Sequence, residues 1–161
     1  MTGHLLLMFF GCSFLANAIG DSEMDRAFEE LGERYVRESP ELSPVAATQM
    51  GDHRFDNRLD QVSPQARDQA AAFYRRYQSE LSAIEPSKLS RAHQVDYALL
   101  DQSLRADLWR LDRLQEWAWN PLIYTELTGG AVYGLMARDF APLKERLGHV
   151  ADRLEQFPRL L

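Results

Sequence analysis

The sequence predicts an all-α protein, an irregular assembly of about six to seven helices. Apolar residues recur at steps of three and four over most of the chain, which is the period of an amphipathic helix. No segment alternates apolar and polar residues for long enough to indicate a strand. The seven prolines fall at expected helix boundaries or in loops, so the helix-breaking residues agree with the periodicity.

Two helices are expected in the first third of the chain. The first begins at a Ser22 cap and ends before Pro40, because proline disfavours helix in the residue before it. Its apolar face is formed by Phe28, Leu31 and Tyr35. The second begins at Ser43-Pro44, a hydroxyl cap followed by proline at the first helical position, and Gly51 is placed to end it.

Ser63-Pro64 repeats this start signal after a polar loop over residues 52–62. The helix that follows is closed by Glu85-Pro86, and its apolar face steps by three or four through Ala66, Ala70, Phe73, Tyr77, Leu81 and Ile84. The longest helix is expected from Ser90 to about Glu116, and the residues of its buried stripe are Tyr97, Leu100, Leu104, Leu108, Leu111 and Leu114.

Three shorter helices are expected towards the end. One begins at Asn120-Pro121 and is broken by Gly129-Gly130, and a separate one follows over residues 131–137. The last spans about 141–156, and its apolar stripe is Leu143, Leu147, Val150, Leu154 and Phe157. Arg146 and Arg153 flank this stripe without covering it. We expect part of it to remain exposed and to favour self-association, since the partner that would cover it is the polypeptide beyond Leu161.

Residues 1–18 have the pattern of a secretory signal peptide. An apolar run over residues 5–15 precedes the small-x-small site Ala16-Asn17-Ala18. The remainder, residues 19–161, is interpreted as the helical N-terminal region of a larger domain. We expect an exported protein, periplasmic or secreted. The alternative is a lipoprotein attached to the membrane at Cys12, which Gly11 precedes.

Charge and cysteine content exclude several classes of function. The net charge of −6 argues against nucleic acid as a partner, because phosphates require a basic face. Cys12 is the one cysteine, so residues 19–161 contain no disulfide, cysteine nucleophile or thiolate metal ligand.

Four clusters of residues are of the types that bind a metal or phosphate or take part in catalysis. Each also has a simpler, structural interpretation. Asp52, His53, Asp56 and Asp60 lack the spacing of a calcium loop and fit a solvated connection. The pairs His93/Asp96 and His149/Asp152 have i,i+3 spacing, but neither is accompanied by a nucleophile or a metal motif. The glycines at 129, 130 and 134 lack the Lys-Ser/Thr of a phosphate loop and fit a break between helices.

Aromatic residues concentrate near the expected helix junction, at Trp109, Trp117, Trp119, Tyr124, Tyr133 and Phe140. They predict either a groove for a peptide or a corner of the core where large rings pack. For the groove, the candidate lining residues are Trp117, Trp119, Asn120, Tyr124 and Arg138. Arg138 could bind a carboxylate, or it could pair with Asp139 or with a helix C-terminus.

Several segments, taken in their order and spacing, carry a resemblance to a known family. They are Pro40-Glu41, Ala47-Thr48-Gln49-Met50-Gly51, Phe55-Asp56-Asn57-Arg58-Leu59, Gln94-Val95-Asp96-Tyr97, Asn120-Pro121 and Arg138-Asp139-Phe140-Ala141-Pro142-Leu143. Together they resemble the bacterial family called domain of unknown function 885. The resemblance implies a mostly helical, extracytoplasmic protein related to zinc-dependent metallopeptidases, which are hydrolases with a His-Glu-x-x-His-type segment C-terminal of this region.

None of the four histidines here is followed by glutamate. The resemblance therefore assigns no catalytic residue and no metal ligand to this chain, and it implies zinc only for full-length members of the family. The expected function is to form a wall or lid of a peptide-binding cleft without catalysis by this chain itself. The alternative is a non-catalytic helical binding or structural module of the cell envelope.

Overall fold

The structure, a computed structural model, describes residues 23–160. The expected signal peptide, its cleavage site at Ala16 and Ala18, Cys12 and the Ser22 cap lie outside the described residues. The described part is helical and contains no strand, which confirms the predicted all-α class. Its six α-helices are α1 (Glu23–Glu38), α2 (Pro44–Met50), α3 (Pro64–Ser82), α4 (Arg91–Trp109), α5 (Leu122–Met136) and α6 (Leu143–Leu154). Short 3-10 turns lie between them, and a π-helical turn (Arg110–Leu114) follows α4.

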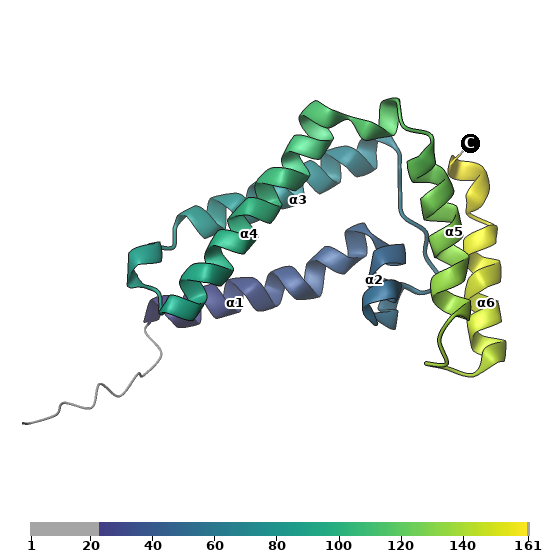
Figure 1. Cartoon of the computed structure of the whole chain (residues 1–161), viewed down its shortest axis with the longest axis horizontal. Coiled ribbons are helices and arrows are strands. Elements are labelled where there is room, and N and C mark those ends of the chain that lie inside the picture. Colours follow the sequence, from purple (N-terminus) through teal and green to yellow (C-terminus); the bar gives the residue numbers. More distant parts are fainter. Residues whose placement is uncertain (1–22, 161) are drawn as a thin grey trace, which may run out of the picture.

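Helices α1, α3 and α4 form one half of the molecule, called here the three-helix body (Figure 1). Its core is apolar and consists of Phe28, Leu31, Tyr77, Leu81, Ile84, Leu89 and Leu104. Most of these residues belong to the predicted helix faces. The Ser63 side chain accepts a hydrogen bond from the Ala66 amide, and Ser90 accepts one from the His93 amide. Both helix starts are therefore capped, as the sequence predicts.

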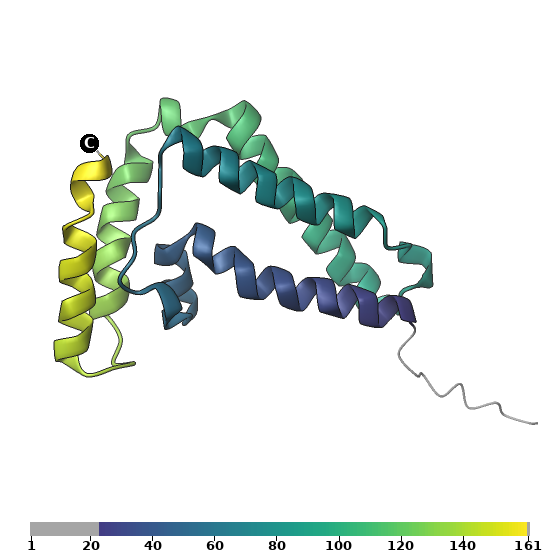
Figure 2. The ribbon, with the colours of Figure 1, turned by 180° about the vertical axis from the view of Figure 1, so that it is seen from behind.

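Helices α2, α5 and α6 form the other half, called here the arginine body. Both ribbon views show α5 and α6 side by side at one end, with α2 between them and α1 (Figures 1 and 2). Its apolar core is small, and it comprises Val45, Leu59 and Ala131 with partly buried Leu127, Phe157 and Leu160. Gly51 ends α2 at a φ of 92°, a left-handed conformation that glycine adopts without strain, as expected.

Helix α5 runs without a break through Gly129 and Gly130, so the predicted break and the separate helix over residues 131–137 are wrong. The reason is the packing of α2 against α5. A β-carbon at Gly130 would lie 2.9 Å from the Gln49 side chain and 3.4 Å from Val45, and one at Gly134 would touch Thr48. These two glycines allow a close approach of helices, whereas the Gly129 position faces open space.

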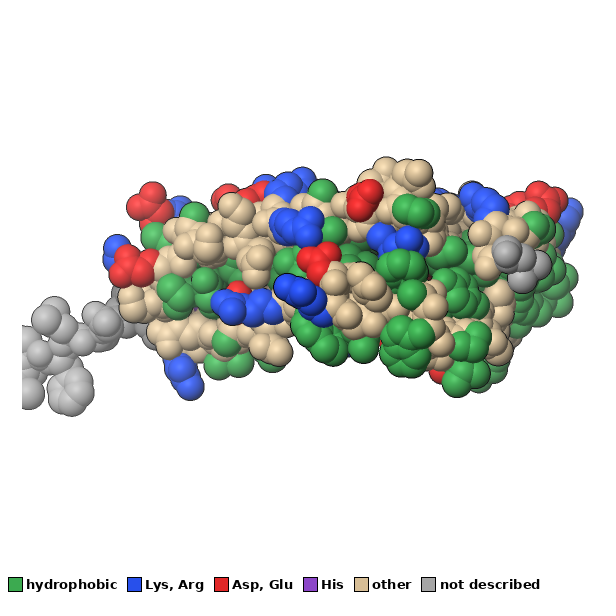
Figure 3. Space-filling model, turned by 90° about the horizontal axis from the view of Figure 1, so that it is seen from above, with side chains coloured by type: hydrophobic (Ala, Val, Ile, Leu, Met, Phe, Trp, Pro, Cys, Tyr) green, Lys and Arg blue, Asp and Glu red, His purple; other side chains and the backbone are tan. Residues whose placement is uncertain are grey.

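Helix α6 turns an unexpected side inward. Arg146 and Arg153, predicted to flank the apolar stripe at the surface, are both buried, and Arg153 is fully so. Part of the stripe faces outward: Leu143, Leu147 and Leu154 are each about half exposed (53%, 48% and 47%), whereas Phe157 packs against the small apolar core. The predicted exposure of the stripe is confirmed, and the predicted position of the two arginines is wrong. Figure 3 shows hydrophobic side chains gathered at this end of the molecule.

At the centre of the arginine body, the hydrogen bonds of Arg153 connect the helices where a larger apolar core would otherwise do so. Its guanidinium donates to the carbonyl oxygens of Arg58 (2.9 Å), Ala131 (2.9 Å) and Pro44 (3.3 Å), and to the Thr48 hydroxyl (2.6 Å). Burial lowers the pKa of Arg153, while Asp56 and Asp60 oppose that shift. One side chain therefore ties α6 to α2, to α5 and to the loop after α2.

The 52–62 loop is also more buried than predicted. Asp56 is almost fully enclosed and accepts hydrogen bonds from the Thr48 hydroxyl at 2.6 Å and from His53 Nδ1 at 2.9 Å. Asp60 accepts from the Ser43 hydroxyl (2.6 Å) and the Val45 amide (2.9 Å), and burial raises its pKa. A solvated connection is therefore the wrong description of these two aspartates, because they fasten the loop to α2.

Candidate groove between the two bodies

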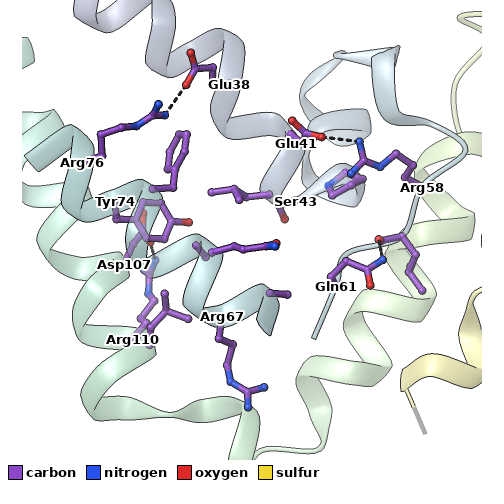
Figure 4. Close-up of a pocket in the computed structure, with 18 residues that line it drawn as sticks. Glu38, Glu41, Ser43, Arg58, Gln61, Arg67, Tyr74, Arg76, Asp107 and Arg110 are labelled. Carbon is purple, nitrogen blue, oxygen red and sulfur yellow. Dashed lines mark hydrogen bonds and ion pairs between the residues drawn. The ribbon is translucent and has the colours of Figure 1, made fainter. Parts of the chain in front are cut away.

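A groove of about 640 Å³ lies between the three-helix body and the arginine body (Figure 4). Its walls come from four places in the sequence: the end of α1 and the start of α2, the loop near Leu59, the first half of α3, and the end of α4. The apolar part of the lining comprises Leu42, Leu59, Ala70, Phe73, Tyr74 and Leu111. A concave site of this size with a mixed apolar and polar lining is typical of ligand-binding sites.

Three arginine–carboxylate pairs surround the groove (Figure 4). They are Arg76 with Glu38 at 2.6 Å, Arg58 with Glu41 at 3.0 Å and Arg110 with Asp107 at 2.9 Å. The hydrogen bonds that Glu38 accepts from Arg76 and Tyr77 lower its pKa. Each pair is near solvent and adds little to stability, but each pair also leaves no net charge. The three pairs therefore make the rim polar without making it basic.

Tyr74 supplies an unused donor to the groove. Its hydroxyl points into the groove (Figure 4) and has no hydrogen-bond partner within residues 23–160. Burial, followed by the nearby negative charge of Asp107, raises the pKa of Tyr74 to about 12. The hydroxyl therefore stays protonated at neutral pH and can donate to a ligand.

Arg67 differs from the other arginines of the groove. Its Nη1 donates a hydrogen bond to the Val62 carbonyl oxygen at 2.7 Å. The guanidinium carbon lies 3.7 Å from the centre of the Trp117 ring. No carboxylate among the described residues pairs with it, and no acceptor there takes a hydrogen from Nε or Nη2. Stacking on an aromatic face holds a guanidinium flat, and this guanidinium points away from the groove, toward the turn between α4 and α5 (Figure 4).

Four of the five predicted lining residues lie together at the turn between α4 and α5. The Tyr124 hydroxyl donates to the Trp117 carbonyl oxygen at 2.8 Å, Asn120 donates to Glu116 at 2.6 Å, and the Trp119 indole donates to Leu114 at 2.9 Å. Trp119 is largely exposed, whereas Trp117 reaches the groove through its contact with Arg67.

The Trp117 indole nitrogen is buried and has no hydrogen-bond partner among the described residues. A buried donor without an acceptor costs about 1–3 kcal/mol.

Arg138 is separated from the other four residues by the length of α5. It donates to the Gln49 carbonyl oxygen at 3.0 Å, near the C-terminal end of α2. The interpretation in which Arg138 pairs with a helix C-terminus is therefore the one that holds, while Asp139 pairs instead with Arg146 at 2.7 Å.

Of the two histidine pairs predicted from the sequence, His93 contacts carboxylates other than Asp96, whereas His149 lies near its predicted partner. His93 lies between α4 and α1, where Nδ1 contacts Asp25 at 2.8 Å and Nε2 contacts Glu29 at 3.2 Å. The hydrogen bond to Asp25 raises the pKa of His93. His149 is 3.9 Å from Asp152 at the surface. Within residues 23–160 no group of three histidine, cysteine or acidic side chains could hold a metal ion.

The groove residues Arg67 and Tyr74 were missed by sequence reasoning. Both lie on α3 beside its apolar face, seven residues apart, and that spacing places them on one side of a helix. The spacing therefore indicates that the two residues share one side of α3. It does not indicate the opposite wall of the groove, because that wall comes from segments distant in the sequence.

Comparisons with known proteins give a family and one solved relative. The family described as bacterial protein of unknown function (DUF885) matches residues 44–161. A solved structure from Shewanella oneidensis, described as a candidate lipoprotein of unknown function, matches with a TM-score of 0.77 and 29% identity over 83% of this chain. The chain spans only 24% of that structure. No curated protein matches. The chain belongs to the DUF885 family.

Proposed function

We propose that this member of the DUF885 family is the N-terminal helical portion of an exported protein and forms one wall of a peptide-binding cleft. It holds a peptide and does not itself catalyse a reaction. The groove between the two bodies carries this proposal. It combines an apolar lining with the unused hydroxyl donor of Tyr74, and a peptide offers apolar side chains and carbonyl acceptors together.

The predicted lining residues at the α4–α5 turn take part through Trp117. Its ring supports Arg67 at the groove, and Trp119 and Tyr124 lie beside it. Arg138, at the other end of α5, belongs to a different surface and contributes to the cleft only if a further segment of the protein extends it. The solved relative is about four times as long as the part matched here, and this ratio supports a wall that further chain completes.

Export is proposed from the signal-peptide pattern in residues 1–18. The lipoprotein description of the Shewanella relative supports the alternative in which Cys12 carries the lipid and the protein is held at a membrane surface. No helix among residues 23–160 is long and apolar enough to cross a bilayer.

Zinc hydrolysis is proposed only for the whole protein, as the resemblance to metallopeptidases implies. The ligands would come from a segment outside this sequence, since no His-Glu-x-x-His segment occurs in it. The exposed stripe of α6 favours a second candidate function, a helical module that packs against another part of the envelope protein. In either case we propose that the polypeptide beyond Leu161 covers Leu143, Leu147 and Leu154.

The test is peptide binding without cleavage. The processed chain is mixed with unstructured peptides that have apolar C-terminal residues, and binding is followed by fluorescence anisotropy while mass spectrometry monitors peptide length. We expect saturable binding with intact peptides. Absence of binding would favour the structural module, and cleavage of the peptides would show that the chain has a catalytic site of its own.

A further inference from the structure

We propose that the groove between the two bodies selects peptide segments with uncharged, apolar side chains, and that the three arginine–carboxylate pairs of its rim enforce this selection. The inference rests on the proposed peptide-binding function. It adds the chemical class of peptide that the groove accepts and the residues that exclude the other classes.

The charged residues of the groove already have partners. Six of the seven charged residues that line it form the pairs Arg76–Glu38 at 2.6 Å, Arg58–Glu41 at 3.0 Å and Arg110–Asp107 at 2.9 Å. The seventh, Arg67, directs its guanidinium away from the groove, toward Trp117 (Figure 4). A charged peptide side chain would therefore have to separate an existing pair before it gained a partner among the described lining residues.

The wall beside Tyr74 is also a poor environment for a charge. Burial raises the pKa of Asp107 even though Arg110 lies 2.9 Å away and opposes the shift. Burial likewise raises the pKa of Tyr74 to about 12. Both shifts disfavour the ionised form, because water is partly excluded from this wall. A carboxylate or ammonium group of a peptide would lose hydration in the same way on entering, so the groove disfavours a charge of either sign.

An apolar side chain meets no such cost. Leu42, Leu59, Phe73 and Leu111 contribute apolar lining from four separate segments of the chain, and each methylene group that such a lining removes from water is worth about 0.8 kcal/mol. The Tyr74 hydroxyl points into the groove and can donate to a backbone carbonyl oxygen (Figure 4). Every peptide offers that acceptor, so the side chains decide which peptides are selected.

The experiment uses five peptides that differ at one position. Each is an octapeptide with fluorescein at its N-terminus and an amide at its C-terminus, and its central residue is leucine, methionine, lysine, asparagine or aspartate. Aspartate matches asparagine in shape and lysine resembles methionine in length, so the ratio within each pair isolates the charge. Binding to the processed full chain is measured by anisotropy. We expect each charged peptide to bind at least about tenfold more weakly than its uncharged match.

Two variants test the role of the rim. Glu41→Gln leaves Arg58 without its carboxylate and should reduce the preference for asparagine over aspartate by about threefold, because a freed arginine can pair with the ligand. Arg76→Gln frees Glu38 and should reduce the preference for methionine over lysine by a similar factor. Glu85→Gln is the control, since this glutamate belongs to an exposed ion pair outside the groove, and it should preserve both ratios.

The outcomes separate this inference from the proposed function. If none of the five peptides binds, peptide binding itself is overturned and the selection with it. If the charged peptides bind the unaltered protein as tightly as their matches, or more tightly, peptide binding stands and the selection is wrong, a result that depends on no variant. If Glu41→Gln and Arg76→Gln retain their helical circular dichroism and leave both ratios unchanged, the rim pairs do not enforce the selection.

Discussion

The two halves of this molecule reach stability by different physical means. The three-helix body buries aromatic and aliphatic residues of α1, α3 and α4 against one another. The arginine body buries two arginines, one aspartate and a threonine, with Asp60 half-buried beside them, and leaves leucines of α6 half exposed. An apolar core depends on volume and tolerates exchange among similar side chains, whereas a polar core depends on each hydrogen bond being made.

The difference also bears on function. The arginine body directs its polar contacts inward and its apolar stripe outward, which suits a unit that packs against further chain. The three-helix body has an apolar core, and its α3 contributes Arg67 and Tyr74 to the groove. In the proposed arrangement both halves line the peptide-binding groove, and the arginine body also carries the attachment face on α6.

The largest contrast should come from placing methionine at the centre of each body. In Arg153→Met, four hydrogen bonds are lost and the carboxylates of Asp56 and Asp60 lose a nearby buried positive charge, so we expect a loss of about 3–5 kcal/mol in the free energy of unfolding. In Leu104→Met the volume is nearly conserved, and the loss should stay below about 1.5 kcal/mol. Urea unfolding followed by circular dichroism measures both. Equal losses would remove the distinction between the two bodies.

A second contrast concerns the exposed stripe. Leu147→Glu should weaken self-association of the chain at least about tenfold and leave its unfolding almost unchanged, because the residue is half exposed. Ala151→Glu, on the same helix, adds the same charge without removing a large apolar side chain and is the control. Sedimentation velocity over a range of concentrations decides the result. A wild-type chain that is a monomer at every concentration would contradict the attachment role of the stripe.

Two adjacent glycines test the close packing of α2 on α5. Gly129→Ala should raise the free energy of unfolding by about 0.5–1 kcal/mol, since alanine favours helix over glycine and nothing lies within 4 Å of the new methyl group. Gly130→Ala should gain none of this, because its methyl group meets Gln49 and Val45. Thermal unfolding of the two variants side by side gives the difference. An equal gain would mean that the two helices can separate at no cost.

The smallest effect is a pH dependence confined to the three-helix body. The hydrogen bond to Asp25 raises the pKa of His93 in the folded state, and Glu29 and Asp96 add to the shift. The protonated ring then contributes stability that is fully present below the unfolded pKa of about 6.5 and is lost as pH rises through the higher folded pKa. Urea unfolding across this interval should show the decline. His93→Gln should remove it, and a decline that persists in this variant would assign it to another group.

Much of the helical architecture is determined by the sequence alone. Ser63 and Ser90 cap α3 and α4, Gly51 ends α2 in the left-handed conformation, and Pro44 and Pro64 begin helices. These signals act over at most one helical turn, where caps and steric limits on the backbone apply whatever the rest of the fold does. The apolar faces of α1 and α3 are likewise buried as the periodicity predicts.

Only the tertiary structure decided which surfaces met. Gly129 and Gly130 have the same local propensity to break a helix, but contact with α2 gives Gly130 a packing role and leaves Gly129 in open space. Periodicity assigned the leucines of α6 to a core, yet Arg153 is buried there because carbonyl oxygens from three other segments converge on it. The groove around Arg67 arises in the same way, since its walls come from segments distant in sequence, and no local pattern encodes their approach.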